Sequence, residues 1–183
     1  HYHYPAVLRE KKDFLRWLDG IDFNEDHEAT LGKRHPGTGQ WFINRDEFQQ
    51  WYRSGRSTLL WCWGMPGAGK SVLASISLDY IRTTEDSRGG VGIAYAYLKY
   101  DSREHQNPAR VLASFLKQLC QKLDEVPEDI FNIFLKFERN DKAPTVREYY
   151  QMLYDIAVNY FQEVILVLDA LDECDQDRRE ELI

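Results

Sequence analysis

The octet GMPGAGKS, Gly64 to Ser71, combines glycines with a lysine and a hydroxyl at a spacing that can bind a phosphate chain. In this spacing a glycine is followed by four residues and then by glycine, lysine and serine. Glycines allow the backbone to wrap a phosphate with its N–H groups pointing inward, and a helix that starts near Ser71 adds its positive dipole end. The predicted phosphate-binding residues are Gly64, Gly67, Ala68, Gly69, Lys70 and Ser71.

Two side chains of the octet would act on a nucleoside triphosphate directly. Lys70 would reach the β- and γ-phosphates, and the hydroxyl of Ser71 would be a ligand of Mg²⁺. The alternative is a plain strand-to-helix turn with a solvated lysine. With glycine at ~7% of residues, the four fixed positions occur by chance in well under ~1% of chains of this length. The sequence therefore favours phosphate binding.

An acidic stretch, VILVLDALDEC, could complete such a site. Asp169 follows a strongly strand-like run, at the edge of the sheet where ligands of open α/β folds collect. Its carboxylate could hold magnesium through water, opposite Ser71. Asp172 or Glu173 could orient or polarise the attacking water. The alternative is an acidic loop whose carboxylates open a helix.

Three short apolar runs are predicted strands that would position these groups. TLLWCW at 58–63 ends at Gly64, VGIAYAYL at 91–98 is β-branched and aromatic, and VILVL at 164–168 stops at Asp169. Strands that alternate with helices imply a parallel sheet with helices on both faces. We therefore expect an α/β fold with three layers, helices over sheet over helices.

Helical spacing and capping residues predict the helices around these strands. Asn107 is a predicted N-cap with Pro108 in the first helical position, and Thr145 with Glu148 forms a predicted capping box. The stretch 21–40 is polar and rich in turn formers, which indicates a linker. The predicted helices lie within 5–20, 45–52, 71–83, 108–119, 127–138 and 145–161.

Composition limits the partners and the compartment. The chain has 183 residues and a formal net charge of -7, and its basic residues are scattered, so nucleic acid is not an expected partner. Three cysteines without a C-x-x-C pair fit reduced thiols in a cytoplasmic protein. No apolar run approaches the ~20 residues that span a bilayer. Of the cysteines, Cys62 and Cys120 are expected in the core.

The two motifs together resemble a known class. GMPGAGKS followed much later by LVLDALDEC, with a small residue after the first aspartate, is similar to the NACHT class of STAND P-loop NTPases. The upstream GTGQWF…DEF…W and the run TLLWCWGMPGAGKSVLASISLDYI resemble more narrowly the nephrocystin-type N-terminal NTPase segment of fungal NOD-like receptors, heterokaryon-incompatibility proteins included. The resemblance covers roughly Phe14 to the end.

The resemblance implies a switch controlled by ATP or GTP with Mg²⁺, slow hydrolysis, and self-association of the whole receptor. It assigns phosphate to the glycine octet, magnesium to Ser71 and Asp169, and the acidic motif to Asp172 with Glu173. Residues 1–40 would be an N-terminal helix and linker, and 41–183 the first part of the NTPase domain. The effector region, helical arm and ligand-sensing repeats of such receptors would lie outside these residues.

In the resembled class a further strand lies between the octet strand and the VILVL strand. Because the chain stops at Ile183, before that strand, we expect a fragment truncated after the acidic-motif strand, with three parallel strands instead of five. Backbone groups facing the gap would lack partners. Such a fragment is expected to bind nucleotide weakly.

Two other functions stay open. A P-loop small-molecule kinase can begin with the same loop, although its arginine-bearing lid has no counterpart in DSREH or QDRREE. A scaffold could use an intact nucleotide site only for assembly.

Weaker signals have simple alternatives. Gly37–Trp41 could fold over the nucleotide base, or be a turn packed under Trp41. Trp61 and Trp63 alternate on the first predicted strand, so both are expected in the core. His1 and His3 are fewer ligands than zinc usually takes, which favours a frayed end.

Overall fold

The computed structural model describes residues 3–85, 89–99, 106–173, 179–180 and 182. Within this part, two strands pair in parallel to form a small sheet, β1 at Val91–Tyr97 and β2 at Glu163–Asp169. Val91 is opposite Glu163 and Tyr97 is opposite Asp169, so the two strands end at the same level. The parallel pairing and the surrounding helices confirm the α/β organisation.

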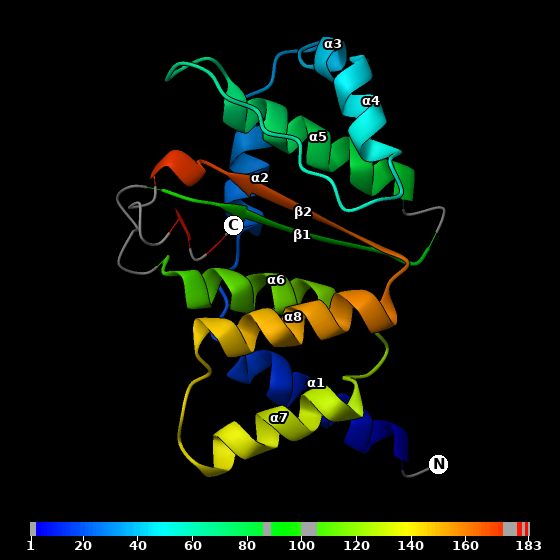
Figure 1. Ribbon diagram of the computed structural model, residues 1–183, viewed down its shortest axis with the longest axis vertical. Coiled ribbons are helices and arrows are strands. Elements are labelled where there is room, and N and C mark those ends of the chain that lie inside the picture. The colour runs from blue at the N-terminus through cyan, green and yellow to red at the C-terminus, as the bar shows by residue number, and fades with distance from the viewer. Residues whose placement is uncertain (1–2, 86–88, 100–105, 174–178, 181, 183) are drawn as a thin grey trace.

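Helices lie on both faces of the sheet, as expected. Figure 1 shows α5 on one face and α6 with α8 on the other, while α1 and α7 form a further layer beyond α6 and α8. No helix in the described ranges is long and apolar enough to cross a membrane. The helices are α1 His3–Trp17, α2 Asn24–Leu31, α3 Gln40–Ile43, α4 Asp46–Tyr52, α5 Lys70–Glu85, α6 Pro108–Lys122, α7 Glu128–Arg139 and α8 Val146–Tyr160.

The two predicted helix starts have the expected caps. The side chain of Asn107 accepts a hydrogen bond from the backbone N–H of Arg110 at 3.0 Å, ahead of Pro108. At α8 the Thr145 hydroxyl accepts from the N–H of Glu148, and the Glu148 carboxylate accepts from the N–H of Thr145. The N–H of Thr145 and then its hydroxyl donate to the Glu148 carboxylate, and both bonds lower the pKa of that carboxyl. Local chemistry therefore fixes both starts.

The core is centred on β1 because this strand is covered on both faces. Its residues from Gly92 onward are buried, and α6 and α8 contribute the facing apolar side chains. β2 is more open, with Glu163 exposed and Leu166 at 43% exposure. The sheet is thus well packed around β1 and open along β2.

The outer edge of β1 is closed by glutamine side chains instead of another strand. Gln118 on α6 donates to the carbonyl of Tyr95 at 2.9 Å and accepts from its N–H at 3.1 Å. Gln106 donates to the carbonyl of Tyr97 and accepts from the N–H of Lys99. These bonds satisfy backbone groups that a free strand edge would expose.

The predicted strand at 58–63 is not formed. Figure 1 shows this segment as a loop from α4 to the start of α5, and within the described residues the sheet has two strands, not the expected three. A strand needs the hydrogen bonds of a neighbouring strand, and here the segment has no such neighbour. Its apolar composition was therefore an insufficient signal.

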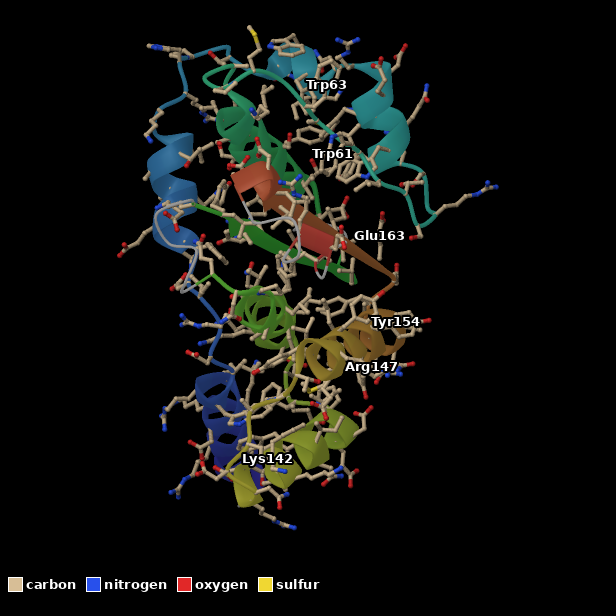
Figure 2. The ribbon with its side chains drawn as sticks, turned by 60° about the vertical axis from the view of Figure 1, so that its left-hand side comes forward. Trp61, Trp63, Lys142, Arg147, Tyr154 and Glu163 are labelled. Atoms are coloured by element: carbon tan, nitrogen blue, oxygen red, sulfur yellow. The ribbon has the colours of Figure 1, made fainter. Side chains whose placement is uncertain are left out.

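The same loop overturns three predictions about the core. Trp61 is 54% exposed, Trp63 is 86% exposed and Cys62 is also exposed. Figure 2 shows both tryptophans on the loop, away from Tyr154 on α8. Because the segment is not part of the sheet, the side chains of Trp61 and Trp63 do not pack into the core beside it. Cys120, in contrast, is fully buried, and that burial raises its pKa to about 12.

The stretch 21–40, predicted to be a linker, contains the helix α2. This helix packs against α5 and buries His27. Nδ1 of His27 lies 2.9 Å from the Tyr97 hydroxyl. Burial first, and then the nearby Arg82, lowers the pKa of His27. The sequence of α2 is mostly polar, and its buried residue is a histidine. It therefore lacks the regular spacing of apolar residues by which an amphipathic helix is predicted.

Candidate functional site

The glycine octet forms a loop that leads directly into α5. Gly67 and Gly69 have φ angles of 78° and 87°, which lie in the left-handed region. A side chain in that conformation costs roughly 1–2 kcal/mol per residue. The N–H of Ala68 donates to the carbonyl of Met65 at 3.1 Å and tightens the turn. Glycine is thus required at these positions by the backbone conformation.

Lys70 is bent back over the loop. Its Nζ donates to the carbonyl of Gly64 at 2.9 Å and to that of Met65 at 3.3 Å. The carbonyl dipoles hold the ammonium against the loop, on an exposed surface. An anion in the loop would meet this charge together with the backbone N–H groups.

The first turn of α5 supplies further donors. The first helical hydrogen bond joins the N–H of Leu73 to the carbonyl of Gly69 at 2.9 Å. The amides of Lys70, Ser71 and Val72 therefore have no acceptor within the helix. Because α5 has 16 residues, its N-terminus carries a full helix dipole. Ser71 lies in this first turn, half-buried.

Asp169 is the last residue of β2 and is 8% exposed. Its backbone carbonyl accepts from the N–H of Leu98 at 3.1 Å. Across the sheet is Tyr97, whose pKa is raised by burial and, second, by the Asp169 carboxylate. The buried acid therefore lies at the carboxyl end of the sheet, beside a neutral phenol.

The chain turns sharply after Asp169. Ala170 has a φ of 59°, in the left-handed region, and a 3-10 turn follows at Leu171–Glu173. Asp172 is exposed, and its backbone carbonyl accepts from Arg179. The side chain of Glu173 lies outside the described residues. The geometry of the predicted acidic motif is thus described for Asp169 and Asp172.

The loop and the acidic motif lie on the same side of the molecule. Figure 1 shows α5 beginning on the side where β1 and β2 end. α5 also packs against β2, which links the helix that follows the loop to the strand that carries Asp169. The tertiary structure therefore places the start of α5 and the carboxyl end of β2 on the same side of the sheet.

The donor set suits a hard cation. The Ser71 hydroxyl and the Asp169 carboxylate are oxygen ligands of the kind Mg²⁺ prefers, with water and phosphate oxygens completing its shell. In the described ranges no group of three or more His, Cys, Asp or Glu side chains could hold a metal without such help. The residues fit an ion shared with a phosphate and do not form an all-protein cage.

The segment Gly37–Trp41 packs on the helix that follows the loop. Gly39 starts α3 with a φ of 83°, and a Cβ there would lie 2.6 Å from Cδ1 of Ile76 on α5. Trp41 is 57% exposed, and its ring meets that of Phe42. Close packing of Gly39 against Ile76 therefore holds the turn, while Trp41 stays largely exposed.

Comparison with known proteins places the chain in a family. The family described as "Nephrocystin 3, N-terminal" matches residues 37–183, which include the glycine octet, both strands and the acidic motif. No curated protein and no solved structure matches the chain. Because the match covers most of its length, the chain belongs to the nephrocystin 3 N-terminal family.

Proposed function

We propose that this chain binds a nucleoside triphosphate, ATP or GTP, with Mg²⁺, as the nucleotide switch of a larger receptor. The observation that carries the proposal is the loop at 64–69, which has two left-handed glycines and opens onto the N-terminus of a 16-residue helix. Such a loop concentrates backbone donors and one ammonium on an anion. The family membership and the position of Asp169 support the same function.

Each part of the site has a defined task in this proposal. The amides of the loop and of the first turn of α5 bind the β- and γ-phosphates, and Lys70 leaves the carbonyls of Gly64 and Met65 to neutralise them. Ser71 and Asp169 hold the magnesium ion, directly or through water. Magnesium, when bound, neutralises phosphate charge. Asp172 and Glu173 are proposed to orient the attacking water.

In the full receptor, exchange of the nucleotide would control self-association in the cytoplasm. This part of the proposal rests on the resemblance to NACHT-type switches. The packing of Gly39 against α5 offers a physical route, because the turn at Gly37–Trp41 contacts the helix that the nucleotide would bind. A change at the start of α5 would reach the segment before the domain through this contact.

The test is the binding of magnesium nucleotide to the Lys70→Ala chain. We expect the affinity for the triphosphate to fall at least tenfold, because the charge-assisted bonds of the ammonium contribute about 1.5–3 kcal/mol. Calorimetry with ATP and GTP measures the loss and identifies the base. Lys142→Ala, an exposed lysine far along the chain, is the matched control (Figure 2). Equal affinity in the wild-type and Lys70→Ala chains would refute the proposal.

A further inference from the structure

A pocket of about 230 Å³ lies beside the closed edge of β1, between the segment 20–24, α5 and α6. Pockets for drug-sized ligands usually measure about 300–1,000 Å³, so this one suits a smaller molecule. It is lined by one carboxylate, three cations and several neutral polar groups. The lining includes Asp22, Asn24, Arg82, Tyr95, Lys117 and Lys122.

The net charge of the residues that line this pocket is positive, whereas the net charge of the whole chain is negative. Arg82, Lys117 and Lys122 line it, against the single acid Asp22, in a chain whose net charge is -7. The Asp22 carboxylate already accepts from the backbone and side-chain N–H groups of Asn24. Among the described residues, the three cations have neither an acid partner nor a hydrogen-bond acceptor. The pocket therefore presents excess positive charge.

Arg82 is held in a position that leaves its donors available. Its guanidinium carbon lies over the Tyr95 ring, 4.6 Å from the ring centre, in a cation–π contact. The Tyr95 hydroxyl donates to Oδ1 of Asn24 at 2.6 Å, which fixes the ring. A cation–π contact uses no N–H donor, so the N–H groups of the guanidinium are left for an anionic acceptor.

The walls of the pocket are anchored by other hydrogen bonds. Ser114 on α6 accepts from the N–H of Ile21 at 2.6 Å and donates to the carbonyl of Arg110 at 2.7 Å. A Cβ at Gly20 would lie 2.8 Å from Cα of Ser114, so this segment is pressed closely against α6. Gln118 fixes the opposite wall through the backbone of Tyr95. The site is therefore preorganised.

The C-terminal carbonyls of α6 would repel an anion here, but they are covered. Nζ of Lys11 on α1 donates to the carbonyl of Gln121 at 3.2 Å and also to that of Leu123. Lys122 adds a basic residue to the last turn of α6. Both lysines offset the negative end of the helix dipole.

We propose that this pocket binds a small molecule that carries a phosphate group. Three cations against one carboxylate match a dianion, and an arginine held over a tyrosine ring with two lysines suits the oxygens of a phosphate group. Arg82 lies about 18 Å along α5 from Lys70, so the site is separate from the glycine loop. The segment 20–24 also lies outside the residues matched by the family. The proposal is independent of the nucleotide function.

The experiment uses the chain carrying Lys70→Ala, so that phosphate binding at the glycine loop is weakened. Calorimetric titrations with inorganic phosphate and with glycerol phosphate should each show one site whose affinity falls as salt is raised. Arg82→Gln and Lys117→Gln should each weaken binding about tenfold. Equal affinity for the two probes assigns the site to free phosphate, and tighter glycerol phosphate binding assigns it to an organic phosphate.

Arg147→Gln and Lys142→Gln are the matched controls, because each removes one exposed positive charge that does not line the pocket (Figure 2). They should leave the affinity unchanged. No saturable binding, or equal weakening by the controls, would overturn the proposal. Arg82→Gln loses the ring contact with Tyr95 and could therefore fail to fold. In that case Lys117→Gln, at a partly exposed residue, tests the proposal. Its circular dichroism spectrum checks that this variant is folded.

Discussion

At the scale of single residues, Gly67, Gly69 and Asp169 show how local conformation and position combine at the candidate site. The two glycines give the loop a shape that other residues would adopt only with strain. Asp169 is buried at the end of β2, where a carboxylate has to be neutralised or paired. These features make the loop and this acid the most informative positions for mutation.

Asp169→Asn should remove the magnesium dependence of nucleotide binding. The change keeps the size of the side chain and removes the charge that would steady the ion, directly or through water. Titration of the variant with nucleotide at several magnesium concentrations measures the effect. Asp124→Asn, which alters an exposed acid, should behave like the wild-type chain. A normal magnesium response in Asp169→Asn would mean that this acid only ends the strand.

Tyr52 should make stability fall at high pH. Burial, and then its hydrogen bond to Glu85, raises the pKa of Tyr52 from 10.0 to about 12. The folded chain therefore favours the protonated phenol, and this contribution is complete below pH 10 and is lost as the pH rises toward 12. Urea unfolding between pH 9 and 12 should show a smaller decline for Tyr52→Phe than for the wild-type chain. Tyr150→Phe, at an exposed phenol, should leave the decline as it is.

At the scale of elements, some helices start at local capping residues, whereas the predicted strand at 58–63 is not formed. The caps of α6 and α8 lie within a few residues of the helices they start. The segment 58–63 depends instead on a distant neighbour, and β2, with Leu166 exposed, does not provide it. Helix ends were therefore predictable, whereas this strand was not.

Thr145→Ala should destabilise the chain by about 1 kcal/mol, because it removes the capping box of α8. Its effect should shrink in acid. The lowered pKa of Glu148 stabilises the fold above the ordinary glutamate range, and that contribution disappears as the pH falls through the folded pKa. Urea unfolding at pH 7 and pH 3 tests both statements. Thr83→Ala, an exposed threonine inside α5, is the control and should have little effect.

At the scale of the whole molecule, a well-packed sheet and its helices contrast with the exposed loop that precedes α5. β1, α6 and α8 form a continuous core, and α5 covers the other side of the sheet. The loop at 58–63, with its exposed tryptophans, leads to the glycine loop at 64–69 without joining the sheet. Among the described secondary-structure elements, only α5 adjoins the glycine loop directly.

This arrangement predicts little catalysis by the isolated chain. Effective hydrolysis requires water, magnesium and phosphate to be held in a narrow geometry, and small misplacements cost large factors in rate. We expect phosphate release barely above that of the Lys70→Ala variant. A coupled assay with saturating magnesium nucleotide measures it. Robust turnover that Lys70→Ala abolishes would show that the two visible halves of the site are catalytically sufficient.

The sequence alone determined the features whose causes are local. The glycine spacing, the caps at Asn107 and Thr145, and the strand-like runs that became β1 and β2 are set by neighbouring residues, so a pattern could find them. The parallel pairing followed from the alternation of strands and helices. The roles of Lys70, Ser71 and Asp169 were inferred from the same spacing and remain proposals.

Only the tertiary structure decided what depends on residues far apart in the chain. It left 58–63 outside the sheet and placed Trp61 and Trp63 in solvent, because a strand exists only where a neighbour offers its hydrogen bonds. It also buried His27 against Tyr97 and gathered Arg82 with the lysines of α6. No periodic sequence pattern predicts these contacts, because each one arises from packing between separate elements.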